Sequence, residues 1–117
     1  MKLMHHSWKN KQRDIDVTQY VYYINAYHYN WHKAIELIIV LRGNIEVSID
    51  NQHYILEEDD VILINPNVGH ATLAKTPESV AMLIHLDPIY FQSYYPNYRL
   101  LHFTCISNSK TRDDMRF

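Results

Sequence analysis

Apolar residues alternate with polar ones, or form short continuous runs, along most of this chain, and polar turns separate the runs. Val17–Tyr23 is rich in valine and tyrosine, which suit a half-buried pleated sheet. Ala34–Leu41 is almost continuously apolar, and Asn44–Ile49 alternates apolar with polar residues. Because Gly43 lies between the last two runs and tolerates a positive φ, we predict that they form a hairpin.

The same criteria predict further strands over His53–Leu56, Val61–Ile64, Ala71–Ala74, Val80–Leu86 and Leu100–Ile106. Asp87–Pro96 differs, because a cap-type aspartate precedes Pro88 and aromatic residues follow three to four positions apart. This pattern predicts one or two helical turns. A series of short strands with one brief helix predicts an all-β fold of the sandwich or jelly-roll type.

The chain has 117 residues, which suits one domain with an apolar core of its own. Its single cysteine, Cys105, excludes an internal disulfide and is typical of a reducing compartment. No apolar run reaches membrane-spanning length, and the first ten residues become polar too early for a signal peptide. We therefore expect a cytoplasmic protein without membrane contacts. The formal net charge of −2 provides no basic surface, so we expect no direct contact with nucleic acid.

Two motifs resemble those of the cupin family. His32-x3-Glu36-x6-Gly43 is similar to the second half of the first cupin motif, with Asn30 where the motif has an earlier histidine. Glu58–His70 is similar to the second cupin motif, with Asp59 where a glycine is usual and Asn65-Pro66 in place of the usual Pro-x-Gly spacing. The resemblance implies a cupin-type jelly roll, also called a double-stranded β-helix.

The sequence at residues 30–37, 41–43, 60–66 and 86–91 is similar to that of the N-terminal, arabinose-binding-like sensor domain of AraC-type transcription regulators. This resemblance implies an effector-sensing domain at 17–107, preceded by an N-terminal arm at 1–16 and followed by a truncated linker at 108–117. It also implies a homodimer that contacts DNA only through a helix-turn-helix domain. Too few residues follow Cys105 to hold that domain, so we expect a fragment of a regulator.

Side chains at even spacing on a strand face the same side of a sheet, so residues 30, 32, 36 and 38 are expected on one face. Polar groups gathered in a largely apolar cavity are typical of sites for small molecules such as sugars. We therefore predict a ligand-binding cavity bounded by residues from two facing strands: Asn30, His32, Glu36, Ile38, His70 and Thr72. In this interpretation the protein senses an effector, needs no cofactor and is not an enzyme.

Three alternatives use the same residues. His32, Glu36 and His70 are a ligand set that zinc, nickel, iron or manganese accepts, as in a metal-dependent oxygenase or isomerase. The neutral amide of Asn30 counts against this, because metal-binding cupins usually have histidine there. In the second alternative, His32 and Glu36 only satisfy each other inside the protein. In the third, the domain serves only to dimerise.

Most of the other tryptophan, histidine and tyrosine residues are expected to lie outside the binding cavity. Trp31 has the opposite parity to its neighbours, which favours a packing role. His85 alternates with apolar residues and is interpreted as a core or rim histidine, while His53 is expected to face solvent. Of the ten tyrosines, we expect most in packing or interfaces and one or two in a pocket.

Overall fold

The computed structural model describes residues 2–10, 15–24, 28–92, 97 and 106–107, and the statements below concern these residues. Within them lie ten strands and a short 3-10 helix, η1, at Pro88–Phe91. The strands are β1 (Lys2–Asn10), β2 (Ile15–Ile24), β3 (His28–Asn30), β4 (Ile35–Arg42), β5 (Ile45–Ile49), β6 (Gln52–Leu56), β7 (Val61–Ile64), β8 (His70–Ala74), β9 (Ser79–Leu86) and β10 (Ile106–Ser107). No described helix is long and apolar enough to cross a membrane.

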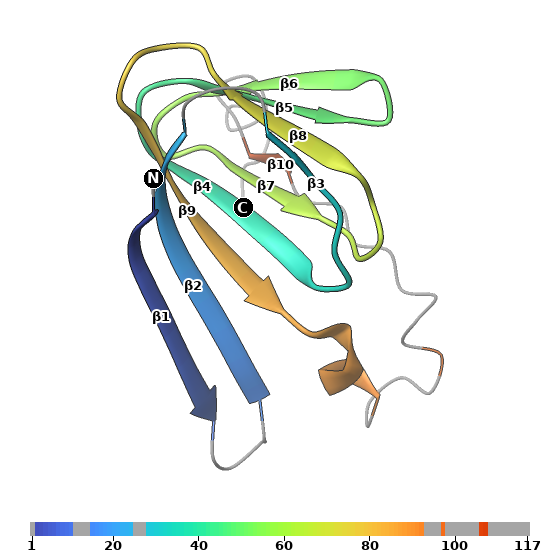
Figure 1. Ribbon diagram of the computed structural model, residues 1–117. Coiled ribbons are helices and arrows are strands. Elements are labelled where there is room, and N and C mark those ends of the chain that lie inside the picture. Colours follow the sequence, from blue (N-terminus) through green and yellow to red (C-terminus); the bar gives the residue numbers. More distant parts are fainter. Residues whose placement is uncertain (1, 11–14, 25–27, 93–96, 98–105, 108–117) are drawn as a thin grey trace, which may run out of the picture.

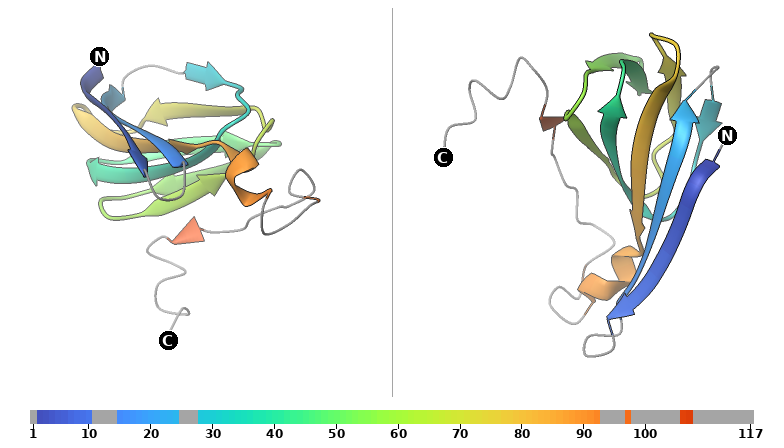
Figure 2. Two further views of the ribbon diagram at one scale, coloured as in Figure 1. Left: turned by 90° about the horizontal axis from the view of Figure 1, so that it is seen from below. Right: turned by 90° about the vertical axis from the view of Figure 1, so that its left-hand side faces the viewer.

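The strands form two antiparallel sheets that face each other (Figures 1 and 2). One sheet has six strands in the order β1-β2-β9-β4-β7-β10, and the other has four in the order β3-β8-β5-β6. Helix η1 follows β9 at one end of the sandwich (Figure 1). This architecture confirms the predicted all-β jelly roll.

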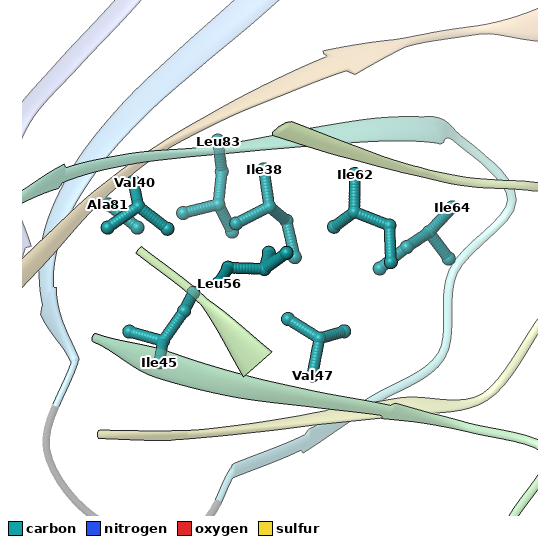
Figure 3. Close-up of a cluster of buried hydrophobic side chains, with 9 residues drawn as sticks. All are labelled: Ile38, Val40, Ile45, Val47, Leu56, Ile62, Ile64, Ala81 and Leu83. Carbon is teal, nitrogen blue, oxygen red and sulfur yellow. The ribbon is translucent and has the colours of Figure 1, made fainter. Parts of the chain in front are cut away.

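The apolar core fills the space between the sheets (Figure 3). Alternate residues point inward because side chains along a strand change sides at every step. The core residues accordingly come from alternate positions of facing strands: Ile38, Val40, Ile45, Val47, Leu56, Ile62, Ile64, Ala81 and Leu83. On β4 the inward series continues from Val40 and Ile38 to Glu36, so the same face becomes polar near the start of the strand.

The predicted hairpin between β4 and β5 is wrong, because the two strands lie in different sheets. The register of β4 against β9 shifts between Val40 and Arg42, and Gly43 follows with φ of +81°. The chain uses this break to cross from one sheet to the other. The crossing is held by hydrogen bonds, since Asn44 donates its backbone N–H to Thr76 Oγ1 (3.0 Å) and accepts from Ser79 Oγ (3.1 Å).

The start of the chain also differs from the prediction. Residues 2–10 form β1, a strand that was not predicted, and it pairs with β2 from Lys2–Tyr22 to Asn10–Ile15. Since β9 occupies one edge of β2, β1 pairs with the backbone groups of the other edge.

Near the other end, the predicted helical turns appear as the shorter η1, and Asp87 accepts a hydrogen bond from the N–H of Ile89 as expected for a cap. Of the predicted strand at 100–106, only Ile106 is described, and there it belongs to β10. The remainder of that strand and residues 93–96 lie outside the described residues.

The acidic turn between β6 and β7 has a structural role. Asp59 adopts φ of +72°, which explains why a glycine is usual at this position of the second motif. Asp60 is buried, and its Oδ2 accepts a hydrogen bond from the N–H of Glu57 at 2.7 Å. Backbone hydrogen bonds of Asp59 and Asp60 with Val40 attach the turn to β4.

Candidate functional site

A cavity of about 290 Å³ lies between the sheets, next to the apolar core. Both sheets and the β3–β4 connection contribute to its walls. The residues that line it are Tyr20, Tyr22, Tyr23, Ile24, Asn30, His32, Glu36, His70, Thr72, Leu83 and His85. This set contains five of the six residues predicted to bind ligand.

Glu36 is the central charged group of the cavity. It lies on β4, its side chain is 1% exposed, and it pairs in register with His85 on β9. The imidazole Nε2 of His85 lies 2.5 Å from Glu36 Oε1, so its N–H donates a hydrogen bond to the carboxylate. A carboxylate this deeply buried needs such partners, because burial without them strongly disfavours the charged form.

His70 reaches Glu36 from the opposite sheet. It begins β8, where it pairs in register with Asn30 of β3, and it is almost completely buried. Its Nδ1–H donates to the backbone carbonyl of Val68 at 3.1 Å. This bond fixes the ring so that Nε2 points into the cavity, 2.9 Å from Glu36 Oε2.

His32 lies in the connection between β3 and β4, not on the strand that carries Glu36 as the parity argument assumed. Its Nδ1–H donates to the carbonyl of Ala34 at 3.0 Å, and its Nε2 lies 3.4 Å from Glu36 Oε1. The connection is attached to the turn before β8, because Asn67 donates its N–H to the carbonyl of His32 and accepts from Trp31 Nε1. The two loops that carry His32 and His70 are therefore linked.

Three buried atoms converge here without a hydrogen-bond partner among the described residues: His32 Nε2, His70 Nε2 and Glu36 Oε2. In His32 and His70 the Nδ1 atom carries the donated proton, so Nε2 presents a lone pair when the ring is neutral. Lone pairs that face a carboxylate at these distances repel it. The centre is therefore built to hold positive charge, either protons on the imidazoles or a cation.

The contacts between Glu36 and the histidines also shift the pKa values of Glu36 and His32. Burial alone would raise the pKa of Glu36, but its contacts with His32, His70 and His85 outweigh burial and hold that pKa well below its usual range. The contact with Glu36 raises the pKa of His32, against the opposing effect of burial. Glu36 is therefore ionised at neutral pH, and His32 binds a proton more readily than a free histidine does.

Tyrosines from β2 form one wall of the cavity. The rings of Tyr20 and Tyr22 are stacked with their centroids 5.7 Å apart, and the Tyr20 ring lies 5.3 Å from that of His85. Burial, with smaller effects of Tyr20 and Glu36, raises the pKa of Tyr22, so this phenol stays protonated near neutral pH. With Tyr23, three tyrosines line the cavity, more than the one or two expected from the sequence.

The structure places three residues differently from the sequence analysis. Ile38 is fully buried in the apolar core and does not line the cavity, because the inward face of β4 changes from polar to apolar between Glu36 and Ile38. Trp31 is 57% exposed instead of packed. His85 lines the cavity and contacts Glu36, which the sequence analysis missed. The sequence could show that His85 points to the same side of its strand as Leu83, because the two are two residues apart. It could not show that His85 pairs with Glu36.

These residues offer the donor types that a divalent transition metal accepts. Ligand atoms lie about 2.0–2.2 Å from Zn²⁺, so neighbouring ligand atoms of a tetrahedral site are about 3.3–3.6 Å apart. The His32–Glu36 separation of 3.4 Å lies in that range, and the His70–Glu36 separation of 2.9 Å is shorter. One donor atom each from His32, Glu36 and His85 lies within 4.8 Å of the others, so His85 joins two of the three residues predicted to bind a metal. Backbone bonds at Nδ1 orient metal-binding histidines in the same way.

Comparisons with known proteins agree with this architecture. The family model described as "Cupin domain" matches residues 25–86. The *Schizosaccharomyces pombe* Cnp3 cupin domain superposes with a TM-score of 0.59 at 12% identity, covering 80% of this chain and 73% of that one. KdgF from *Halomonas* sp. gives 0.55 at 15% identity, covering 70% and 76%.

An HTH_3 family transcriptional regulator from *Vibrio cholerae* gives a TM-score of 0.57 at 20% identity and covers 72% of this chain. The match spans 50% of the regulator's own length. Comparison with curated proteins gives no match. At these identities, the solved structures establish the shared fold alone.

Proposed function

The chain belongs to the cupin family, and on that premise we propose that it senses a small polar effector as part of an AraC-type transcription regulator. The observation that carries this proposal is the cavity of about 290 Å³, in which unpartnered polar atoms face a tyrosine wall. Its volume is near the lower end of ligand pockets, about 300–1,000 Å³, which suits a molecule the size of one sugar ring.

The cavity residues would divide the work of binding between them. Glu36 and the imidazole Nε2 atoms of His32 and His70 accept hydrogen bonds from ligand hydroxyls. The rings of Tyr20 and Tyr22 offer apolar faces to the carbon skeleton of the ligand. A ligand that lacks the matching donors leaves these buried groups unpaired, which provides specificity.

The regulator part of the proposal is supported by the similarity of the sequence motifs to those of AraC-type sensor domains and by the fold shared with the Vibrio cholerae regulator. In this proposal the domain is cytoplasmic, binds its effector without turnover and forms a homodimer. The regulator contacts DNA through a helix-turn-helix domain. The cupin domain itself contacts neither nucleic acid nor membrane.

A metal centre is a second candidate, favoured by the convergence of His32 Nε2, His70 Nε2 and Glu36 Oε2. Zinc, nickel, iron and manganese all accept imidazole and carboxylate ligands. A bound divalent ion would supply positive charge and an open position for a ligand oxygen. The chain's own contribution is the orientation of the rings, through the bonds from Nδ1 to the carbonyls of Ala34 and Val68.

Calorimetric titration of the purified chain with a panel of neutral aldopentoses and aldohexoses tests the sensor proposal. We expect saturable binding of at least one sugar by the wild type and an affinity loss of about 5–150-fold in His70→Ala, which removes a buried acceptor worth about 1–3 kcal/mol. His53→Ala is the matched control, because His53 is an exposed histidine outside the cavity.

Thermal unfolding of the same variants distinguishes a binding role from a structural one. The sensor proposal predicts that His70→Ala folds and loses the stabilisation that the bound sugar gives the wild type, about 2.7 kcal/mol at a hundred times Kd. If no sugar binds the wild type and His70→Ala fails to fold, the histidines serve a structural network and the proposal is wrong.

A further inference from the structure

We infer that His85 on β9 supplies the imidazole that the first motif lacks at Asn30, so that a divalent transition metal in this cavity is held from the six-stranded sheet. This inference rests on the metal-bearing form of the proposed function. It assigns a role to a residue outside both motifs, and it frees Asn30 for another task.

The position of Asn30 shows what the site lacks. Asn30 lines the cavity from β3, an edge strand of the four-stranded sheet, and pairs in register with His70. An amide is neutral and is a weaker ligand for transition metals than imidazole. With His32, Glu36 and His70 alone, the cavity offers two imidazoles and one carboxylate.

His85 restores a third imidazole from the opposite side. It pairs in register with Glu36 across β4 and β9, and its Nε2 lies 2.5 Å from Glu36 Oε1. A bound ion would replace the proton that this Nε2 donates to the carboxylate. Its ring centroid lies 4.8 Å from that of His32. The donor atoms of His32, Glu36 and His85 are mutually within 4.8 Å, so they form a group that could close around one ion.

The surroundings of His85 favour a defined ring position. Tyr20 packs against the ring with centroids 5.3 Å apart, and the side chain is 27% exposed, similar to the 22% of His32. His85 also lies on a central strand, between β2 and β4 in the sheet order. A histidine on a paired central strand is held more rigidly than one on a three-residue edge strand.

If the third imidazole comes from β9 instead of β3, other groups of the cavity become available to an organic ligand. Besides His70, the four-stranded sheet then presents Asn30 and Thr72 to the cavity, one amide and one hydroxyl. Both groups donate and accept hydrogen bonds. The inference therefore assigns Asn30 and Thr72 to the organic ligand, and His85 to the metal.

Zinc titration of tag-free, chelator-treated protein tests the inference, with Zn²⁺ alone as the probe and binding heat and bound-zinc stoichiometry as readouts. His85→Gln keeps a donor to Glu36 but removes the imidazole. We expect one zinc per wild-type chain and an affinity loss of more than about a hundredfold in His85→Gln, above the 10–100-fold typical of outer-shell changes. Asn30→Ala, which alters the motif position itself, and His53→Ala are expected to bind zinc as the wild type does.

Two results would overturn the inference. One is wild-type zinc affinity in His85→Gln, and the other is the absence of stoichiometric zinc in the wild type. Neither bears on sugar binding by the metal-free protein, so the sensor proposal is judged separately by its own titration. Thermal unfolding of His85→Gln shows whether its fold is intact, and Asn30→Ala with weaker zinc binding than His85→Gln would assign the ligand role to residue 30 instead.

Discussion

The two ends of the sandwich interior are built from the same strands but have opposite chemistry. Along β4 the inward residues change from Val40 and Ile38 to Glu36, and along β9 they change from Leu83 to His85. The apolar end is closed by packing, whereas the polar end keeps a cavity. Strand alternation therefore fixes which residues point inward, and the choice of residue at each inward position determines whether the space becomes core or site.

The two ends also obtain their stability differently. The apolar end gains from removing aliphatic surface from water. At the polar end, the burial of Glu36 opposes ionisation, and three histidines offset that cost. We therefore expect core variants to change stability more than binding, and cavity variants to change binding more than stability.

The largest expected effect on stability is that of Ile38→Ala. Ile38 is fully buried at the boundary between core and cavity, and its truncation leaves a void that costs about 2–5 kcal/mol in unfolding free energy. Denaturant titration measures the loss, with Ile39→Ala on the opposite face of β4 as the control. If Ile38→Ala costs no more than Ile39→Ala, the division into core and cavity is wrong at this position.

Glu36→Gln is expected to alter the pH dependence of stability in metal-free protein. His32 has a folded pKa above its ordinary 6.5, so its contribution is complete below pH 6.5 and is lost as pH rises through the folded pKa. Glu36 has a folded pKa below its ordinary 4.5, so its contribution is complete above pH 4.5 and is lost as pH falls through the folded value. These two contributions therefore coincide between pH 4.5 and 6.5.

Chemical denaturation at a series of pH values measures this profile. In Glu36→Gln the contact that raises the pKa of His32 is weakened, so the loss of stability above pH 6.5 should become shallower. His53→Ala should keep the wild-type profile. A Glu36→Gln profile that parallels the wild type would show that Glu36 does not control protonation in the cavity.

The smallest expected effect is that of Trp31→Phe. This change removes the hydrogen bond from Trp31 Nε1 to the carbonyl of Asn67, at 3.1 Å on the protein surface. We expect a loss of about 0.5–1.5 kcal/mol or less in unfolding free energy, and a modest loss of ligand affinity, because the bond links the loops that carry His32 and His70. A ligand affinity equal to that of the wild type would show that this link does not position the histidines.

Local pattern was sufficient to predict most strands, and it matched Val61–Ile64 in full. Local pattern was insufficient to predict which strands pair, because pairing depends on residues far apart in the sequence. The crossing at Gly43 looks like a hairpin turn in sequence, because a positive φ serves both purposes. Nothing local shows that the two strands flanking Gly43 join different sheets.

The spatial grouping of the candidate residues was predicted in part and for a partly incorrect reason. His32, Glu36 and His70 do meet, but His32 reaches the cavity from a connection instead of from the same strand face. His85 was missed because its contact with Glu36 depends on the register of β4 against β9, across 49 positions of sequence. Ile38 was included because alternation gives its direction but not the point where the cavity ends.

The central claim is that Glu36 and its three histidines form a binding site for a small polar molecule. Histidine side-chain nitrogen NMR spectra, recorded while aldopentoses and aldohexoses are added, test it most directly. We expect at least one sugar to shift the ring-nitrogen signals of His32, His70 and His85 in a saturable way while those of His53 stay unchanged. If no sugar moves the three cavity histidines, or if His53 shifts as much as they do, the claim is contradicted.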